Sequence, residues 1–149
     1  MGIDTYLIGE KHFRQSNKPD NYWQLFNGVP ELLEICNLNY GNLANRPLIK
    51  ELKIELGYWR GKSNMLYQLY AQIGKQYEYD DFYMSNDFYE KALEKCDQLL
   101  KLSDEEANLQ MIKEGISTCK SDLVYTQQVL SQALIVASKD WKLKLEISY

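Results

Sequence analysis

The residues best suited to chemistry lie in one segment, Gly57 to Asn64, which reads GYWRGKSN. It combines two aromatic rings, two cations and an amide. It also opens the stretch from Tyr58 to Tyr89, which holds ten of the nineteen aromatic residues of the chain. Aromatic rings carry much apolar surface, and arginine is the cation that stacks on them. The segment therefore predicts either the main core element or a binding surface.

A helix beginning at Trp59 would bring several of these groups together. With the periodicity of an α-helix, Arg60, Asn64 and Tyr67 fall on one flank, beside the apolar stripe that contains Trp59. A guanidinium, an amide and a phenol suit recognition of an anion or an amide. We take Arg60, Asn64, Tyr67 and Trp59 as candidate ligand- or partner-binding residues. The alternative is that Arg60 pairs with a structural carboxylate, as semi-buried arginines usually do.

The remaining residue types give no sign of catalysis. His12 is the only histidine and lies in a polar stretch, so neither a catalytic triad nor a metal site with two histidines is expected. Cys36, Cys96 and Cys119 lack metal-ligand spacing, which predicts buried thiols in a reducing compartment. Glycine-rich phosphate loops and nucleophile motifs are absent. We predict no catalytic residue, no metal and no cofactor, so the chain leans toward a non-enzyme.

The charge pattern limits the classes of partner. With 17 basic and 21 acidic residues the net charge is -4, which leaves no positive field for nucleic acid. No apolar stretch approaches the roughly 20 residues of a membrane span, and the first residues do not form a signal peptide. A cytoplasmic protein that binds neither nucleic acid nor membrane is expected.

Apolar periodicity and turn residues predict the elements of the fold. In chain order they are a strand at 3–8, short helices at 22–26 and 31–36, a strand at 52–56, a helix at 59–76, three helices capped by Ser85, Ser103 and Ser121, and a strand at 141–149. The alternation at 52–56 favours a strand, although the same apolar residues would also suit a helix. The strand at 141–149 alternates strictly.

These elements predict one domain, residues 1–149, of the helix-dominated α+β class. Four to five helices would pack on a small sheet that joins the N- and C-terminal strands, because neither strand could stay ordered alone. So many aromatic residues would also leave apolar surface uncovered, which predicts a homo-oligomer. Whether the aromatic residues from Tyr77 to Tyr89 lie in the core or on the surface stays open.

Two segments resemble a family of small uncharacterised phage and prophage proteins. Residues 1–7, MGIDTYL, resemble the family's GLDMYL start, and Tyr58, Trp59 and Arg60 match the opening of its central YWRKANAIHKWF-like helix. Asn64 matches with one residue inserted, and 141–149 takes the place of the family's aromatic final strand. The family's histidine is replaced here. The resemblance implies a phage or mobile-element origin and no mechanism, and it pairs Asp4 with Arg60 as a candidate structural ion pair.

The preferred hypothesis is a non-enzymatic interaction protein of phage or mobile-element type that modulates a host protein. Plentiful aromatic surface without a catalytic constellation favours this class. The alternative is a protein that binds a small molecule, a nucleotide or another small anion, through a helix face with Arg60, Asn64 and Tyr67.

Overall fold

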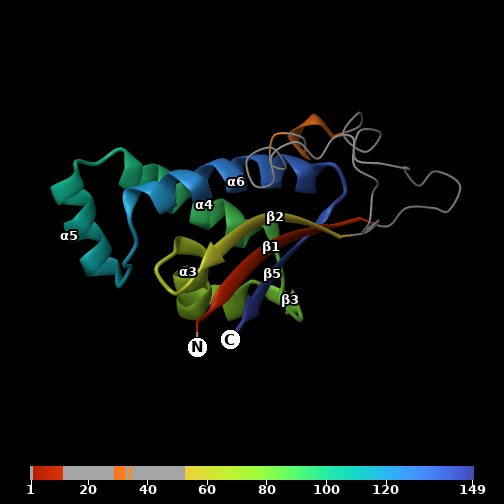
Figure 1. Cartoon of the computed structure of the whole chain (residues 1–149), viewed down its shortest axis with the longest axis horizontal. Helices are drawn as coiled ribbons and strands as arrows, with labels where there is room; N and C mark the ends of the chain where they lie inside the picture. The colour runs from red at the N-terminus through yellow and green to blue at the C-terminus, as the bar shows by residue number, and fades with distance from the viewer. Residues whose placement is uncertain (1, 12–28, 33, 35–52) are drawn as a thin grey trace, which may run out of the picture.

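The computed structural model describes residues 2–11, 29–32, 34 and 53–149 of the chain (Figure 1). The strands in these ranges are β1 (Asp4–Glu10), β2 (Lys53–Arg60), β3 (Glu78–Asp80), β4 (Tyr83–Met84) and β5 (Lys142–Ser148). The helices are α3 (Met65–Ile73), the 3-10 helix η2 (Gly74–Gln76), α4 (Asn86–Leu100), α5 (Asp104–Glu114) and α6 (Lys120–Ser138). The predicted helix at 22–26 lies outside the described residues; of the one predicted at 31–36, residues 31, 32 and 34 are described and are helical.

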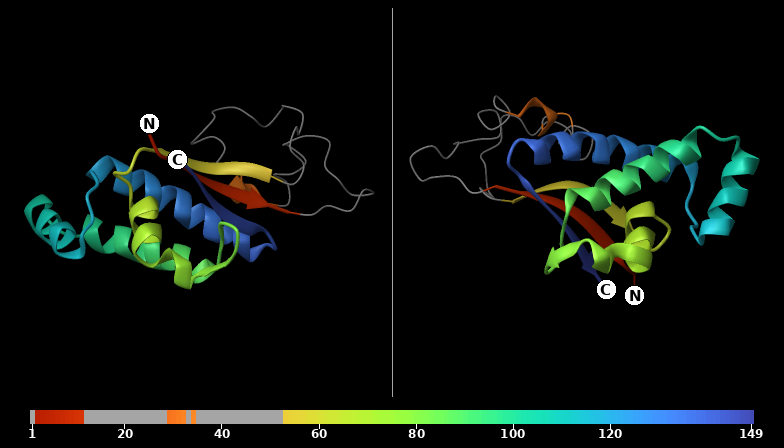
Figure 2. Two further views of the ribbon diagram at one scale, coloured as in Figure 1. Left: turned by 90° about the horizontal axis from the view of Figure 1, so that it is seen from below. Right: turned by 180° about the vertical axis from the view of Figure 1, so that it is seen from behind.

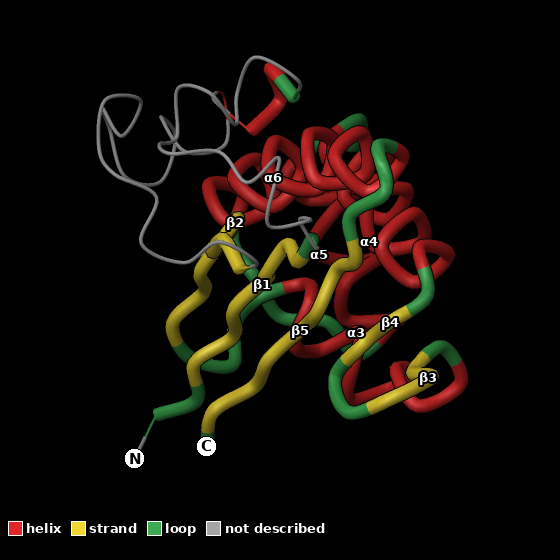
Figure 3. The backbone as a smooth tube through the Cα atoms, turned by 90° about the vertical axis from the view of Figure 1, so that its right-hand side faces the viewer, coloured by secondary structure: helices red, strands yellow, loops and turns green. Residues whose placement is uncertain are grey.

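The five strands form one antiparallel sheet in the order β2-β1-β5-β4-β3. Strand β1 lies between β2 and β5, with Asp4 opposite Ser148 and Glu10 opposite Lys142. Figures 1 and 3 show the two ends of the chain next to each other at one end of this sheet. The predicted pairing of the first and last strands is confirmed, and with it the α+β class.

The helices cover one face of the sheet. Helices α4 and α6 lie side by side across that face, and α3 packs against both of them (Figure 2). Viewed from the side, the strands form one layer and the helices form the other (Figure 3). Helix α5 stands at the far end of the helical layer, away from the strands (Figure 1). Within the described ranges, no helix covers the second face of the sheet.

The alternation of β1 and β5 explains this two-layer packing. Buried and half-buried residues alternate along β1, so Thr5 and Leu7 face the helices together with Leu145 of β5. Leu7 and Leu145 have no exposed surface, and burying one leucine side chain stabilises a fold by about 1.5–3 kcal/mol. The residues between them face the other way, which leaves their side chains on the uncovered face.

The predicted helix over 59–76 is wrong in its first part, because Trp59 and Arg60 belong to β2. The helix begins only at Met65. A Cβ atom on Gly57 would come within 2.7 Å of the Trp59 ring, so the glycine leaves the space that this ring fills in the strand. Pairing with β1 and burial of the indole outweigh the helical spacing of the apolar residues.

Capping residues mark the helix starts closely. Ser103 caps α5 as predicted: its Oγ accepts from the Glu106 N–H at 3.2 Å and donates to the Glu106 carboxylate at 3.0 Å. Ser85 precedes α4 as predicted, without a side-chain cap bond. The predicted cap of α6 is wrong, because Cys119 and not Ser121 is its N-cap.

The aromatic residues from Tyr77 to Tyr89 divide between core and surface. Phe88 and Tyr89 of α4 are fully buried, with ring centroids 5.5 Å apart in edge-to-face contact. Tyr79 of β3 is 59% exposed. The aromatic stretch is therefore not one continuous binding surface.

Candidate functional site

The uncovered face of the sheet presents half-buried and exposed aromatic and charged side chains on neighbouring strands. We call it the open face and define it by Asp4, Tyr6, Ile8 and Glu10 of β1, Tyr58 and Arg60 of β2, Lys144 and Glu146 of β5, and Tyr83 of β4. Along the three long strands these residues alternate with those that pack on the helices. Figure 3 shows the strand layer with its described helices on the other side only.

Tyr6 and Tyr58 form the aromatic centre of the open face. They are direct cross-strand neighbours, and their ring centroids lie 5.1 Å apart with the planes at 34°. Tyr58 is 38% exposed and Tyr6 is half-buried. Desolvation, assisted by the nearby carboxylate of Asp4, raises the pKa of Tyr6. Tyrosine rings at a protein surface are typical of protein-binding sites.

Asp4 and Arg60 stand opposite each other at one end of this pair. The Asp4 carboxylate accepts a 2.6 Å hydrogen bond from the Tyr58 hydroxyl, and this bond is the main cause of the raised pKa of Tyr58. Among the described residues, no carboxylate forms an ion pair with the Arg60 guanidinium. The sequence predicted an ion pair between Asp4 and Arg60. The two residues are cross-strand neighbours, but the group that Asp4 binds is the Tyr58 hydroxyl. An exposed cation remains beside two tyrosine rings.

The other end of the open face is internally paired. The Glu10 carboxylate accepts a hydrogen bond from the Tyr83 hydroxyl and lies 3.3 Å from Lys53 Nζ. The bond to Glu10 is the main cause that raises the pKa of Tyr83 to about 12. Lys144 Nζ lies 5.3 Å from the centroid of the Tyr83 ring and 3.8 Å from Glu146. These contacts link β1, β5 and β4 with each other and β1 with β2, and each charged group in them has a partner of opposite charge.

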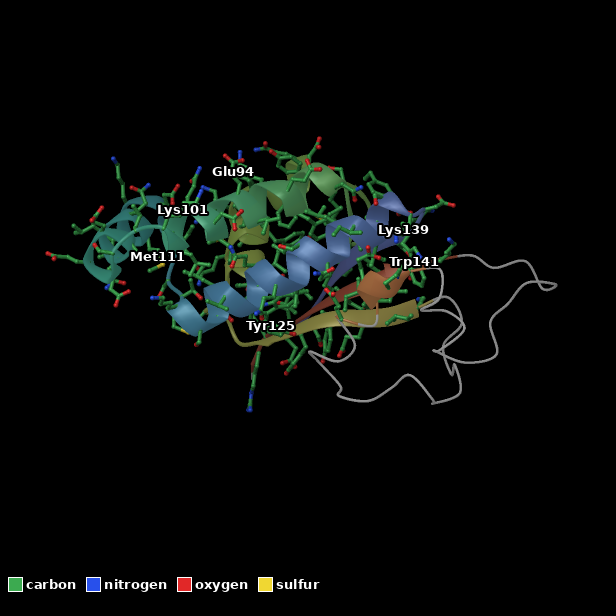
Figure 4. The ribbon with its side chains drawn as sticks, turned by 90° about the horizontal axis from the view of Figure 1, so that it is seen from above. Glu94, Lys101, Met111, Tyr125, Lys139 and Trp141 are labelled. Atoms are coloured by element: carbon green, nitrogen blue, oxygen red, sulfur yellow. The ribbon has the colours of Figure 1, made fainter. Side chains whose placement is uncertain are left out.

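Trp59 is a core residue. It is 2% exposed on the helix-facing side of β2, and its Nε1 donates a 2.9 Å hydrogen bond to Thr126 Oγ1 of α6. Its ring also meets Tyr125 edge to face at 5.5 Å. Figure 4 shows Tyr125 where α6 passes over β2, and its hydroxyl accepts from the Tyr58 N–H at 3.2 Å. In this state Trp59 cannot contact a partner.

Asn64 positions a helix. It is 1% exposed, and as the N-cap of α3 its Oδ1 accepts from the Tyr67 N–H at 2.8 Å. Its Nδ2 donates to the Gly61 carbonyl at 2.9 Å. Because both ends of the amide are used, Asn64 offers nothing to a ligand. With Arg60 on a strand, the predicted helix face of Arg60, Asn64 and Tyr67 does not exist.

Tyr67 lines a different feature, a cavity of about 320 Å³ along α3 and η2. Tyr70, Lys75 and Tyr149 also line this cavity. The ammonium group of Lys75 and the tyrosine hydroxyls are hydrogen-bond donors, which suit the binding of a small anion. Arg60 is not among its lining residues. Arg60 and Tyr67, which were predicted to share one binding face, therefore lie at different sites.

A second cavity, of about 250 Å³, lies between the end of α4, α5 and the start of α6. Leucine side chains form much of its wall, and Met111 points toward it from α5 (Figure 4). Cys119 lies at its rim with an exposed side chain. The pKa of Cys119 is lowered, mainly by a hydrogen bond with the Ser121 side chain and secondly by a hydrogen bond from the Asp122 backbone N–H.

The three cysteines were predicted to be buried. Cys96 confirms this, since it is fully buried and desolvation raises its pKa to about 12. The prediction is wrong for Cys119, because a helix starts there and its side chain faces solvent. Cys36 and His12 lie outside the described residues.

Metal-binding clusters and membrane-spanning helices are both absent from the described part of the chain. It contains no group of three or more histidine, cysteine, aspartate or glutamate side chains that could hold a metal ion. None of its helices is long and apolar enough to cross a membrane.

Comparisons with protein-family models, with curated proteins and with solved structures found no match. The geometry alone therefore defines the class: an α+β protein in which helices cover one face of an antiparallel sheet and tyrosines occupy the other. On that open face an exposed cation, Arg60, lies on the same strand and side as a partly exposed tyrosine ring, Tyr58.

Proposed function

We propose that this chain is a non-enzymatic interaction protein that binds another protein through its open face. The observation that carries the proposal is the exposed Arg60 guanidinium on the same face as the paired Tyr6 and Tyr58 rings. Tyrosine and arginine are the residues most enriched where binding energy concentrates in protein interfaces. A rigid strand pair holds both rings in place, so little entropy is lost when a partner binds.

The surroundings indicate the chemistry of the partner. The three carboxylates of the open face (Asp4, Glu10 and Glu146) are interspersed with its cations, so the surface has no strong positive field for nucleic acid. We expect an apolar or aromatic side chain on the tyrosine pair and a carboxylate on Arg60. A phage or mobile-element protein that modulates a host protein fits this description, and that origin remains part of the proposal.

The experiment compares capture by matched variants. Wild type, Tyr58→Ala and Arg60→Glu are immobilised and exposed to a lysate of the cells in which the protein occurs. Lys62→Glu is the control, because it makes the same charge change in the exposed loop after β2. A true partner is retained by wild type and Lys62→Glu and is lost from both open-face variants.

The captured protein is then purified and its affinity measured by calorimetry. We expect Arg60→Glu to weaken binding by on the order of tenfold or more, since about 1.4 kcal/mol corresponds to a factor of ten. Equal binding by all variants would reject the open face as the site. Circular dichroism of each variant excludes unfolding as the cause of a loss.

Small-anion binding is the second candidate, and the cavity lined by Tyr67 and Lys75 is the observation that favours it. A ligand at 100 times its dissociation constant stabilises a protein by about 2.7 kcal/mol, which thermal-shift screening of nucleotides and inorganic anions detects. Loss of the shift in Lys75→Ala, with Arg60→Glu unchanged, would identify this cavity as the site.

A further inference from the structure

Helix α5 carries a second apolar surface that faces away from the molecule. Ala107 and Met111 are its buried residues, whereas Leu109 is 63% exposed and Ile112 is 76% exposed. Helices on the surface of a domain usually expose polar residues on the outer side. Two adjacent exposed aliphatic residues on one helix therefore require an explanation.

The position of α5 makes this surface accessible to large partners. Figures 1 and 2 show α5 at one end of the helical layer, away from the strands, with α4 and α6 on one side only. A helix that projects in this way can lie against another helix without obstruction from the sheet. The open face and the α5 surface are separate regions.

The charges on this surface would match those of the same surface on a second copy of the chain. Glu105 lies four residues before Leu109 and Lys113 lies four residues after it, so the three form one ridge along the helix. Both charged residues are exposed, and neither has an ion-pair partner in the described part of the chain. The negative and positive ends are thus placed symmetrically about an apolar centre.

We propose that α5 is a self-association site, at which two copies of this chain pair their α5 helices antiparallel about a twofold axis at Leu109. In this arrangement Leu109 packs on Leu109 of the second copy. Lys113 of each copy then stands at the level of Glu105 of the other, because both are the same distance from the axis. A parallel pairing would instead place like charges together.

The association is weak and reversible. Helix α5 has 11 residues and is therefore only about 16 Å long, so the contact is smaller than the roughly 800 Å² per partner of a standard interface. Concentration and ionic strength should control it, since exposed ion pairs are screened by salt. This site is independent of the protein partner proposed for the open face.

Charge reversal tests the arrangement. Sedimentation equilibrium over a concentration series at low salt should give a dimer for wild type. Glu105→Lys and Lys113→Glu should each raise the dimer dissociation constant by on the order of tenfold, because each reversal replaces two attractions by two repulsions. The double variant E105K/K113E restores opposite charges and should recover dimerisation. Failure of this recovery would overturn the antiparallel pairing.

Disulfide trapping tests the axis. Leu109→Cys, in a background with Cys36→Ser and Cys119→Ser, should form a covalent dimer under mild oxidation. Ile135→Cys is the control, since Ile135 is 41% exposed on α6 and lies outside the proposed contact. Equal trapping of both variants, or a wild type that remains monomeric at the highest concentration, would refute the proposal.

Discussion

The Tyr58 hydroxyl on β2 donates a 2.6 Å hydrogen bond to the carboxylate of Asp4 on β1, 54 residues away in the chain. This contact occupies the acid that the sequence assigned to Arg60. It fixes the Tyr58 ring against Tyr6 and leaves the guanidinium exposed on the same face. One hydrogen bond thus determines which groups of the open face can act on a partner.

Arg60→Ala should change the free energy of unfolding by no more than about 0.5 kcal/mol. A buried Asp4–Arg60 pair would instead lose on the order of 3 kcal/mol on removal of the arginine. Asp4 is only half-buried and Arg60 is exposed, so solvent screens both charges. Urea denaturation of Arg60→Gln, Asp4→Asn and the double variant measures their coupling. A coupling of several kcal/mol would show that the ion pair forms.

Thr126→Val should destabilise the fold by about 1–3 kcal/mol, because it leaves the buried Nε1–H of Trp59 without its acceptor. Thr126→Ser is the matched control, since it keeps the hydroxyl and should retain most of the stability. Denaturant titrations followed by Trp fluorescence compare the variants. If valine and serine are equally destabilising, the hydrogen bond makes no net contribution.

The sequence predicted correctly those elements that are determined by residues close together in the chain. Strand β5 alternates strictly from Lys142 to Ser148, and Ser103 with Glu106 forms the predicted cap of α5. The pairing of β1 with β5 followed from the physical need of each strand for a partner. These predictions required no knowledge of distant contacts.

The prediction of the site was wrong where the structure depends on contacts between segments that are distant in the sequence. Trp59 suits the apolar stripe of a helix, and only pairing with β1 places it in a strand. The Tyr6–Tyr58 pair was missed for the same reason, although both residues alternate with apolar neighbours. That alternation is the signal in the sequence that could have identified the open face.

Gly57→Ala should destabilise the protein by roughly 1–3 kcal/mol, the usual cost of overpacking a core. A Cβ atom at this position would lie 2.7 Å from the Trp59 ring and 2.9 Å from Val129, so both must move. Gly2→Ala is the control, because nothing lies within 4 Å of its added Cβ. Thermal unfolding of the two variants should separate them clearly, and equal melting temperatures would contradict the packing.

Alkaline pH should destabilise the fold through Tyr70 and Tyr83, whose pKa values are raised to about 12 from 10.0. The folded state binds these protons more tightly, so stability is complete below pH 10 and falls as the pH rises toward 12. The variant Y70F/Y83F cannot titrate there, and its melting temperature should fall less over this interval. Tyr67→Phe, which removes a phenol that is not among the causes of either raised pKa, should follow wild type. A parallel loss in Y70F/Y83F would assign the effect to other groups.

Cys119 should react with iodoacetamide much faster than Cys96 in the folded protein, studied with Cys36 replaced by serine. The thiolate is the reactive form, and Cys119 is exposed with a lowered pKa, whereas burial raises the pKa of Cys96 to about 12. Its reaction should therefore begin at a lower pH than that of an ordinary thiol.

Ser121→Ala removes the main cause of the lowered pKa of Cys119, so labelling of Cys119 at neutral pH should slow by roughly severalfold. Ser131→Ala, on the same helix but away from the thiol, should leave the rate unchanged. Mass spectrometry of labelled peptides measures each site, and a similar rate for Cys96 and Cys119 would contradict the exposure of the α6 N-cap.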